Sequence, residues 1–277
     1  MPILLEDQLG DVLGKARRGL RLNEPQLAEK SGVGLENVEA FGAGKLLDDA
    51  DSAAKIARTL GLYAPALLEL GRGEWHPGEI ALPPTAAAYN QPFGDDMTVN
   101  FYLVWDQDGG RAAAFDTGGD CGPLLQTLRE KKLKLDAIFL THTHSDHVAD
   151  LDRLTAETDA PVYVSELEKI GGATTVRDGE TFTVGDLKIT ARLTPGHSPG
   201  GTTYVVEGLE PTLAVVGDAL FAASMGGVSP EKYADALKAN REKIFSLPDD
   251  TAVLPGHGPV TTVDKEKRHN PFYAADA

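Results

Sequence analysis

Seven metal-capable side chains of this sequence stand in short turns that follow apolar runs. Four of them fall within Thr141-His-Thr-His-Ser-Asp-His147, and the others are His197 in Thr-Pro-Gly-His-Ser, Asp218 in Val-Val-Gly-Asp-Ala and His257 in Pro-Gly-His-Gly-Pro. Imidazole nitrogens and carboxylate oxygens are the ligands that divalent cations such as zinc, iron and manganese accept. Three histidines and an aspartate within six residues have no ready structural explanation. The pattern therefore predicts a site for two metal ions.

The spacing inside the first cluster allows one short segment to serve both ions. Residues 135–140 form an apolar run of strand length, and side chains of a strand repeat on one side every two residues. His142 and His144 should therefore leave the strand end on the same side. A helix start follows, so Asp146 and His147 should point from its first turn. We expect two ligands for each ion from this segment, with the three more distant residues completing both sites.

These motifs, in this order, resemble the metallo-β-lactamase superfamily, and within it the glyoxalase II branch of thioester hydrolases. The resemblance covers about residues 84–273. It includes the strand pair at 99–105 and 112–118, the segment Pro255-Gly-His-Gly-Pro259 and the ending His269-Asn-Pro-Phe272. The fold that it implies is of the α/β class, an αββα sandwich with two sheets face to face, helices outside and the metals at one edge. The strand-like and helix-like segments that alternate over 161–254 agree with this expectation.

The resemblance also implies a role for each ligand. Two triplets flank one bridging carboxylate: His142, His144 and His197 for the first ion, Asp146, His147 and His257 for the second, and Asp218 between them. Asp116, at the family's first motif, would accept a hydrogen bond from a ligand imidazole and fix its orientation. The candidate catalytic residues are Asp146 and Asp116, and Asp146 would act as a ligand rather than as a general base.

The expected reaction follows from the two ions. A water shared by two divalent cations loses a proton near neutral pH and can attack a thioester carbonyl, while one cation stabilises the oxyanion. Zinc is the first candidate metal, and iron and manganese are alternatives, because the same ligands accept all three. For an anionic thioester or a related substrate, the candidate binding residues are Lys265, Lys267 and Arg268, since related enzymes use basic residues near this end.

Two alternative functions remain open. A persulfide dioxygenase would hold a single iron with His142, His144 and Asp218 or a similar set. Glyoxalase-like and dioxygenase members often carry Gly-Arg-x-Asp-Phe after the bridging aspartate, whereas Ala222–Pro230 of this chain lacks the arginine and the acidic residue. That difference, together with the complete second triplet, argues against the dioxygenase. The second alternative is a regulator whose metal domain senses a metabolite while its N-terminal domain binds DNA.

Residues 1–75 are expected to form a small all-α domain, followed by a linker at 76–83 and the catalytic domain at 84–277. Gln26-Leu-Ala-Glu-Lys-Ser-Gly-Val33 resembles the second helix and turn of a Cro/repressor-type helix-turn-helix domain, over about residues 8–71. DNA binding needs a basic surface, but residues 1–75 contain nine Lys and Arg against twelve Asp and Glu. We therefore expect a packing or dimerisation module, through which a homodimer could form, rather than a nucleic-acid partner.

Composition sets the remaining limits. The chain has 277 residues, a formal net charge of −16 and one cysteine, so an internal disulfide framework is excluded. Strong negative charge repels polyanions at long range. The N-terminal residues lack the pattern of a signal peptide, and no apolar run reaches the length of a membrane span. We expect a cytoplasmic enzyme without a membrane partner.

Overall fold

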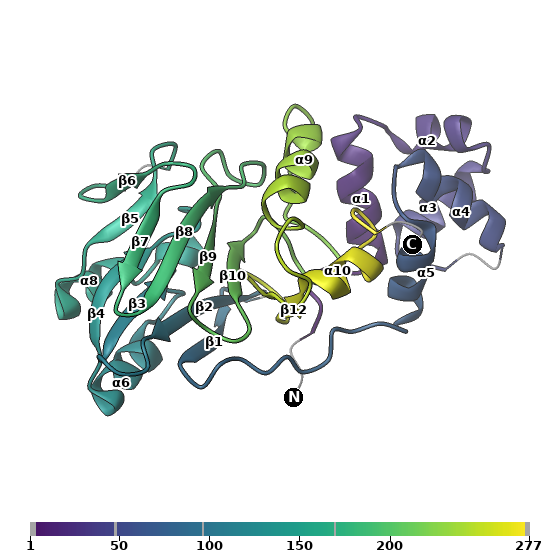
Figure 1. Cartoon of the computed structure of the whole chain (residues 1–277). Coiled ribbons are helices and arrows are strands. Elements are labelled where there is room, and N and C mark those ends of the chain that lie inside the picture. The colour runs from purple at the N-terminus through teal and green to yellow at the C-terminus, as the bar shows by residue number, and fades with distance from the viewer. Residues whose placement is uncertain (1–3, 47–48, 96, 169, 275–277) are drawn as a thin grey trace.

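The computed structural model describes residues 4–46, 49–95, 97–168 and 170–274, with two β-sheets at the centre and a group of short helices at one end (Figure 1). The strands of the first sheet are, in spatial order, β1 (Ala86–Phe93), β2 (Met97–Trp105), β3 (Arg111–Phe115), β4 (Lys134–Phe139), β5 (Val162–Ser165) and β6 (Thr174–Val176). Those of the second are β12 (Thr261–Thr262), β11 (Ala252–Pro255), β10 (Leu213–Gly217), β9 (Thr202–Glu207), β8 (Leu187–Leu193) and β7 (Thr181–Val184).

Strand direction brings several loops to common edges of the sheets. In the first sheet β3, β4, β5 and β6 pair in parallel, and in the second β10 and β11 do so, while all the other neighbours are antiparallel. Parallel neighbours end at the same edge, so the loops after β3 and β4 lie together, as do those after β10 and β11. Each of these four loops contains a residue predicted for the metal site.

The layers follow from the alternation of side chains along buried strands. On β2, Tyr102 and Val104 belong to the core between the two sheets, whereas Phe101 and Leu103 pack toward α6 (Gly122–Lys131) and α8 (Leu151–Thr158). The outer face of the second sheet is covered by residues near α9 (Tyr233–Lys243) and α10 (Val263–His269), and the short α7 (Ser145–Val148) follows β4. The predicted αββα sandwich is thereby confirmed.

Five short helices precede the sandwich, and we call residues 4–73 the helical region. The five helices are α1 (Leu9–Gly19), α2 (Glu24–Ser31), α3 (Leu35–Gly42), α4 (Ala50–Thr59) and α5 (Ala64–Arg72). Two features mark the start of α2. The Asn23 side chain caps the helix by accepting a hydrogen bond from the Gln26 N–H, and Pro25 stands in the first turn. Residues 74–83 contain neither helix nor strand. The helix-turn-helix identification itself rests on the sequence resemblance and stays a prediction.

The helical region shares a hydrophobic core with the sandwich. Buried residues of its helices form one cluster with five side chains from the C-terminal part of the chain, namely Ala223, Met225, Tyr233, Ala236 and Phe272. At the same boundary His269 pairs with Glu69 at 2.8 Å and stacks on Trp75. Figure 1 shows α1 and α5 beside α9 and α10. The helices are thus packed against the sandwich as part of one folded body.

None of the helices in the described ranges has both the length and the apolar composition needed to cross a membrane.

Candidate metal centre

The segments that follow four strands supply all seven predicted ligands. His142 and His144 follow β4, Asp146 and His147 lie on α7, His197 follows β8, Asp218 follows β10, and His257 follows β11. Their loops are tightly fitted. A Cβ atom at Gly256 would stand 2.2 Å from Asp218 Oδ1 and 2.6 Å from His147 Cε1, so only glycine fits beside these two ligands. Gly256 therefore allows the close packing of the site.

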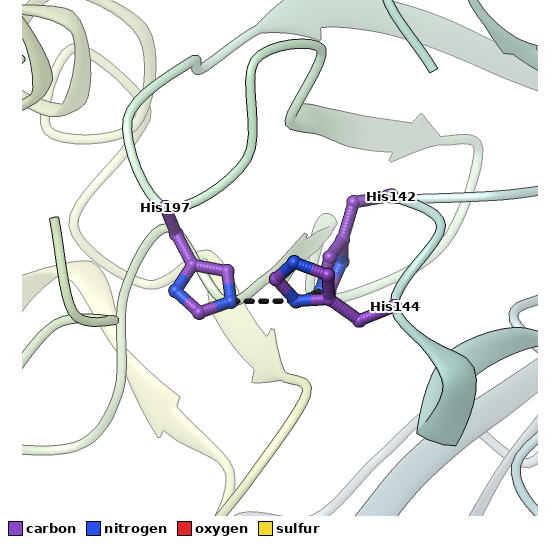
Figure 2. Close-up of side chains that lie close together, drawn as sticks. All are labelled: His142, His144 and His197. Atoms are coloured by element: carbon purple, nitrogen blue, oxygen red, sulfur yellow. Dashed lines mark hydrogen bonds between the residues drawn. The ribbon is translucent and has the colours of Figure 1, made fainter. Parts of the chain in front are cut away.

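The first predicted triplet is assembled, and Figure 2 shows its three imidazole rings gathered from two loops. His144 Nδ1 lies 3.1 Å from His142 Nε2 and 3.0 Å from His197 Nε2. Tetrahedral ligands about 2.0–2.1 Å from a zinc ion stand about 3.3 Å apart. The nitrogens therefore have the separation that a shared cation requires. His142 is buried, whereas His144 is exposed, so this triplet opens toward solvent.

The second triplet is equally close, and all its members are buried. Asp146 Oδ2 lies 3.4 Å from His147 Nε2 and 3.2 Å from His257 Nε2. The first turn of α7 presents Asp146 and His147 from one segment, which is the placement that the sequence predicts. The loop after β11 adds His257 from the other sheet.

Asp218 stands between the two triplets. Its Oδ2 lies 3.2 Å from His197 Nε2 and 3.4 Å from His257 Nε2, and its Oδ1 lies 3.4 Å from His147 Nε2. Among the described residues, His147 Nε2 and Asp218 Oδ1 are buried without a hydrogen-bond partner. Buried polar atoms of that kind are costly unless a bound ion or water satisfies them. The arrangement of donors thus fits two divalent cations with Asp218 between them.

The outer ring nitrogens of three ligands are held by acceptors. His147 Nδ1 donates to Asp116 Oδ2 at 2.8 Å, His197 Nδ1 to the Gly227 carbonyl at 3.0 Å, and His257 Nδ1 to the Thr98 carbonyl at 2.6 Å. Such bonds select the ring tautomer and leave the other nitrogen free to bind a metal. The role predicted for Asp116 is thus compatible with its position next to His147.

Asp116 is itself firmly placed. It is buried at the end of β3 with φ of 59°, a left-handed conformation that aspartate tolerates better than most residues. Its carboxylate also accepts 2.8 Å hydrogen bonds from the N–H and the hydroxyl of Thr141, the residue before His142. One carboxylate therefore connects the segments that carry ligands of both triplets.

Burial and nearby charges have opposite effects on the pKa values of the buried ligands. Burial lowers the pKa of His142 to about 2, which keeps its imidazole neutral and able to bind a metal. Burial also opposes the charged form of His147, but the nearby Asp218 and Asp116 carboxylates raise its pKa to about 10. Although burial favours protonated Asp218, the nearby charge of His147 holds the pKa of Asp218 well below the usual range. Metal binding at the second triplet would therefore release protons.

A buried carboxylate outside the sequence motifs connects the two loops that carry the first triplet. Glu168 Oε2 accepts from the N–H and the hydroxyl of Thr143, at 3.2 and 2.6 Å. Its Oε1 accepts from the Gly200 N–H at 2.7 Å and from the Ser198 hydroxyl. Thr143 separates His142 from His144, and Ser198 follows His197. Sequence reasoning missed Glu168 because the segment after β5 has no recognisable spacing, and its burial shows only in three dimensions.

Replacing Glu168 with Gln should weaken the first triplet. An amide presents an NH₂ group to donors that now face a carboxylate, so at least one buried hydrogen bond is lost at about 1–3 kcal/mol. We expect a lower melting temperature and a lower metal content after dialysis. Glu166→Gln is the matched control, since Glu166 is exposed on the same segment and such substitutions usually stay within about 0.5 kcal/mol. Equal metal content in the two variants would argue against the role of Glu168.

The predicted substrate residues lie on α10, apart from the ligand loops in sequence. Lys267 pairs with Asp249 at 2.6 Å and Arg268 with Asp264 at 2.7 Å. Lys265 stands in the first turn of the same helix, which contacts α5 of the helical region. The first two side chains are therefore engaged with neighbouring carboxylates. A role in substrate binding stays a prediction for all three residues.

Comparison with known proteins supports this description. A family model described as "Metallo-beta-lactamase superfamily" matches residues 94–257. The chain is 33% identical to a "Probable metallo-hydrolase YqgX" of Bacillus subtilis over 208 residues, 65% of this chain and 94% of that protein. It is 29% identical to the "Hydroxyacylglutathione hydrolase GloC" of Haemophilus influenzae, over 62% of this chain and 92% of that protein.

A solved structure shows a related protein with metals bound. The crystal structure of TTHA1623 in a di-iron-bound form matches with a TM-score of 0.54 and 30% identity, over 66% of this chain and 99% of that one. The match of the family model leaves out the helical region. From the fold, the two ligand triplets and these likenesses, the chain belongs to the metallo-beta-lactamase superfamily.

Proposed function

We propose that this protein is a hydrolase that uses two divalent cations to cleave a thioester. The observation that carries the proposal is the position of Asp218 between two complete triplets of ligands. The similarity to a probable metallo-hydrolase supports metal-dependent hydrolysis, and the similarity to a hydroxyacylglutathione hydrolase favours a thioester.

The side chains of the site have different roles in this reaction. Two bound cations would lower the pKa of a water between them and polarise the scissile carbonyl. Asp146 serves as a ligand of the second triplet, because its carboxylate faces His147 and His257. Asp116 holds His147 in the tautomer that leaves Nε2 free. A thiolate is a good leaving group, so the chain needs no strong acid to protonate it.

The nature of the metal is part of the proposal. Five imidazoles and two carboxylates suit zinc, iron and manganese. We propose zinc first, with iron as the main alternative, because a related structure holds two irons.

We further propose that the helical region is a packing module. Its core is continuous with residues of the sandwich, and its third helix presents Glu36 and Glu39, where a DNA-binding helix would need basic side chains. A small-molecule substrate is therefore the partner that we propose, in preference to nucleic acid.

Metal content and thioester cleavage, measured together, test the proposed function. Protein purified without added metal is expected to contain about two metal ions per chain, in line with its two triplets, and to hydrolyse S-lactoylglutathione. His144→Ala should lose one ion and the turnover. A single iron, no thioester cleavage, and oxygen uptake with glutathione persulfide would replace the hydrolase with the mononuclear dioxygenase.

A further inference from the structure

One residue of the first sheet holds both ends of the turn that carries His257. Asn100 lies on β2, is buried, and donates from Nδ2 to the Pro255 carbonyl at 3.0 Å and to the Gly258 carbonyl at 2.8 Å. Its backbone N–H donates to the Gly256 carbonyl at 2.7 Å. Three donor hydrogens of Asn100 therefore bind carbonyl groups on either side of a predicted ligand.

The orientation of the Asn100 amide is set from its other side. Asn90 lies opposite Asn100 on β1 and donates from Nδ2 to Asn100 Oδ1 at 2.8 Å. The amide nitrogen of Asn100 must then face the two carbonyls, because a carbonyl oxygen accepts hydrogen bonds and cannot donate them. Both polar atoms of the side chain are thus satisfied. A carboxylate at this position could not make the same contacts, since it has no hydrogen to donate when ionised.

Neighbouring residues of β2 complete the attachment of the turn. Side chains two positions apart on a strand point to the same side, and the Tyr102 hydroxyl also donates to the Pro255 carbonyl, at 2.6 Å. Two positions before Asn100, the Thr98 carbonyl accepts from His257 Nδ1 at 2.6 Å. Residues 98–102 of the first sheet therefore hold both the backbone and the ring of a ligand that follows β11 of the second sheet.

The position of this turn determines the geometry of the second triplet. The Gly256 N–H donates to the Gly217 carbonyl at 2.9 Å, which connects the turn to the end of β10. His257 Nε2 lies 3.2 Å from Asp146 Oδ2 and 3.4 Å from Asp218 Oδ2. Distances between a metal and its ligands vary by only about 0.2 Å. A small displacement of the turn would therefore take His257 out of reach of a shared ion.

We propose that Asn100 is a positioning residue of the second triplet, whose two amide hydrogens fix the direction of His257 and thereby set the affinity for one of the two metal ions. This inference rests on the two-metal site of the proposed function and is independent of the substrate. Asn100 acts through His257 and through the backbone of its turn. Replacement of groups that orient metal ligands typically lowers metal affinity by about 10–100-fold.

Asn100→Asp tests the proposal because it keeps the size of the side chain and removes both donations. Zinc-loaded full-length protein, titrated with a chelator, should release two ions in separate steps. In the variant one ion should bind about 10–100-fold more weakly, while the other keeps its native affinity. Asn100→Ala removes the same donors without burying a charge. It should weaken the same ion, and it provides the test if the buried carboxylate prevents folding.

Asp106→Ala is the matched control at the other end of β2. Asp106 is buried and accepts hydrogen bonds from the N–H groups of Gly109 and Arg111, at 3.2 and 2.8 Å. Its loss should lower the melting temperature while both ions keep their native affinity. If the Asn100 and Asp106 variants lost zinc in proportion to their melting temperatures, the role of Asn100 would be general stability and the inference would be overturned.

Thioester cleavage by the same samples separates this inference from the proposed function. If the native protein binds two ions but cleaves no thioester, the proposed reaction fails, and weaker binding of one ion in Asn100→Asp still supports the positioning role. A native protein that binds one ion would contradict the two-metal site. Unchanged affinity for that ion in Asn100→Asp would then overturn the role of Asn100 as well, whereas weaker binding would assign the ion to His257 and uphold the role.

Discussion

Asp218→Asn is expected to reduce thioester hydrolysis by about three orders of magnitude, equivalent to ~4 kcal/mol of transition-state stabilisation. The amide keeps the shape of the side chain but loses the charge that faces His147, His197 and His257. An amide oxygen is a poor bridge between two cations, so the metal content should fall from about two ions per chain to one or fewer. Atomic emission and steady-state kinetics on the same sample measure both effects.

The control for Asp218→Asn is Asp186→Asn, in the turn between β7 and β8 and away from the ligand loops in sequence. It should keep native metal content and turnover. An Asp218→Asn protein with two ions and near-native kcat would show that the bridging carboxylate is dispensable and would remove the main support for the two-metal proposal.

Deletion of residues 1–75 is expected to leave a protein that does not fold stably. It would expose Met225, Tyr233 and Phe272, which are buried against the helices. Burial of one large apolar side chain contributes about 1.5–3 kcal/mol, so these three account for about 5 kcal/mol or more. Whole domains have only about 5–15 kcal/mol of stability. Urea unfolding and the soluble fraction after expression measure the loss.

A milder change at the same boundary provides the comparison. Arg21→Gln breaks an exposed ion pair with Glu231 that also joins the helical region to the sandwich. Exposed pairs contribute about 0–1 kcal/mol, so this variant should unfold near the native midpoint. If the truncated chain unfolded cooperatively at the native urea concentration, the helices would be a separable module and the shared core would be energetically unimportant.

The candidate ligands can be selected from the sequence because each one stands in a short local pattern. The distance between His142 and His147 is set by a strand end followed by one helical turn, so spacing alone constrains their geometry. The αββα sandwich is predictable mainly through the family resemblance, while the runs over 187–193 and 202–206 indicate its strands directly. Prediction of this fold from the sequence therefore needs both the strand pattern and the family resemblance.

The remaining parts of the site depend on contacts between distant segments. Glu168 is one acidic residue among 42 Asp and Glu, and only the fold brings it to Thr143 and Ser198. Likewise, the amphipathic pattern of α1 predicts a buried face but not that Met225 and Tyr233 lie in the same cluster. The sequence shows that such faces must be covered, whereas their partners follow from tertiary packing.

Lys15 and the Ser224 hydroxyl both donate a hydrogen bond to the buried Asp7 carboxylate, and this network has a thermodynamic consequence. The network joins the helical region to the loop of Asp218. If undocking of the helices opens this loop, a cation that binds the closed centre more tightly stabilises the docked helices by the difference in binding free energy. The coupling is reciprocal, so loosening of α1 should weaken the binding of metal. A chelator would then act on this protein partly by undocking its N-terminus, and hydrogen exchange in α1 would report the occupancy of a site outside that helix.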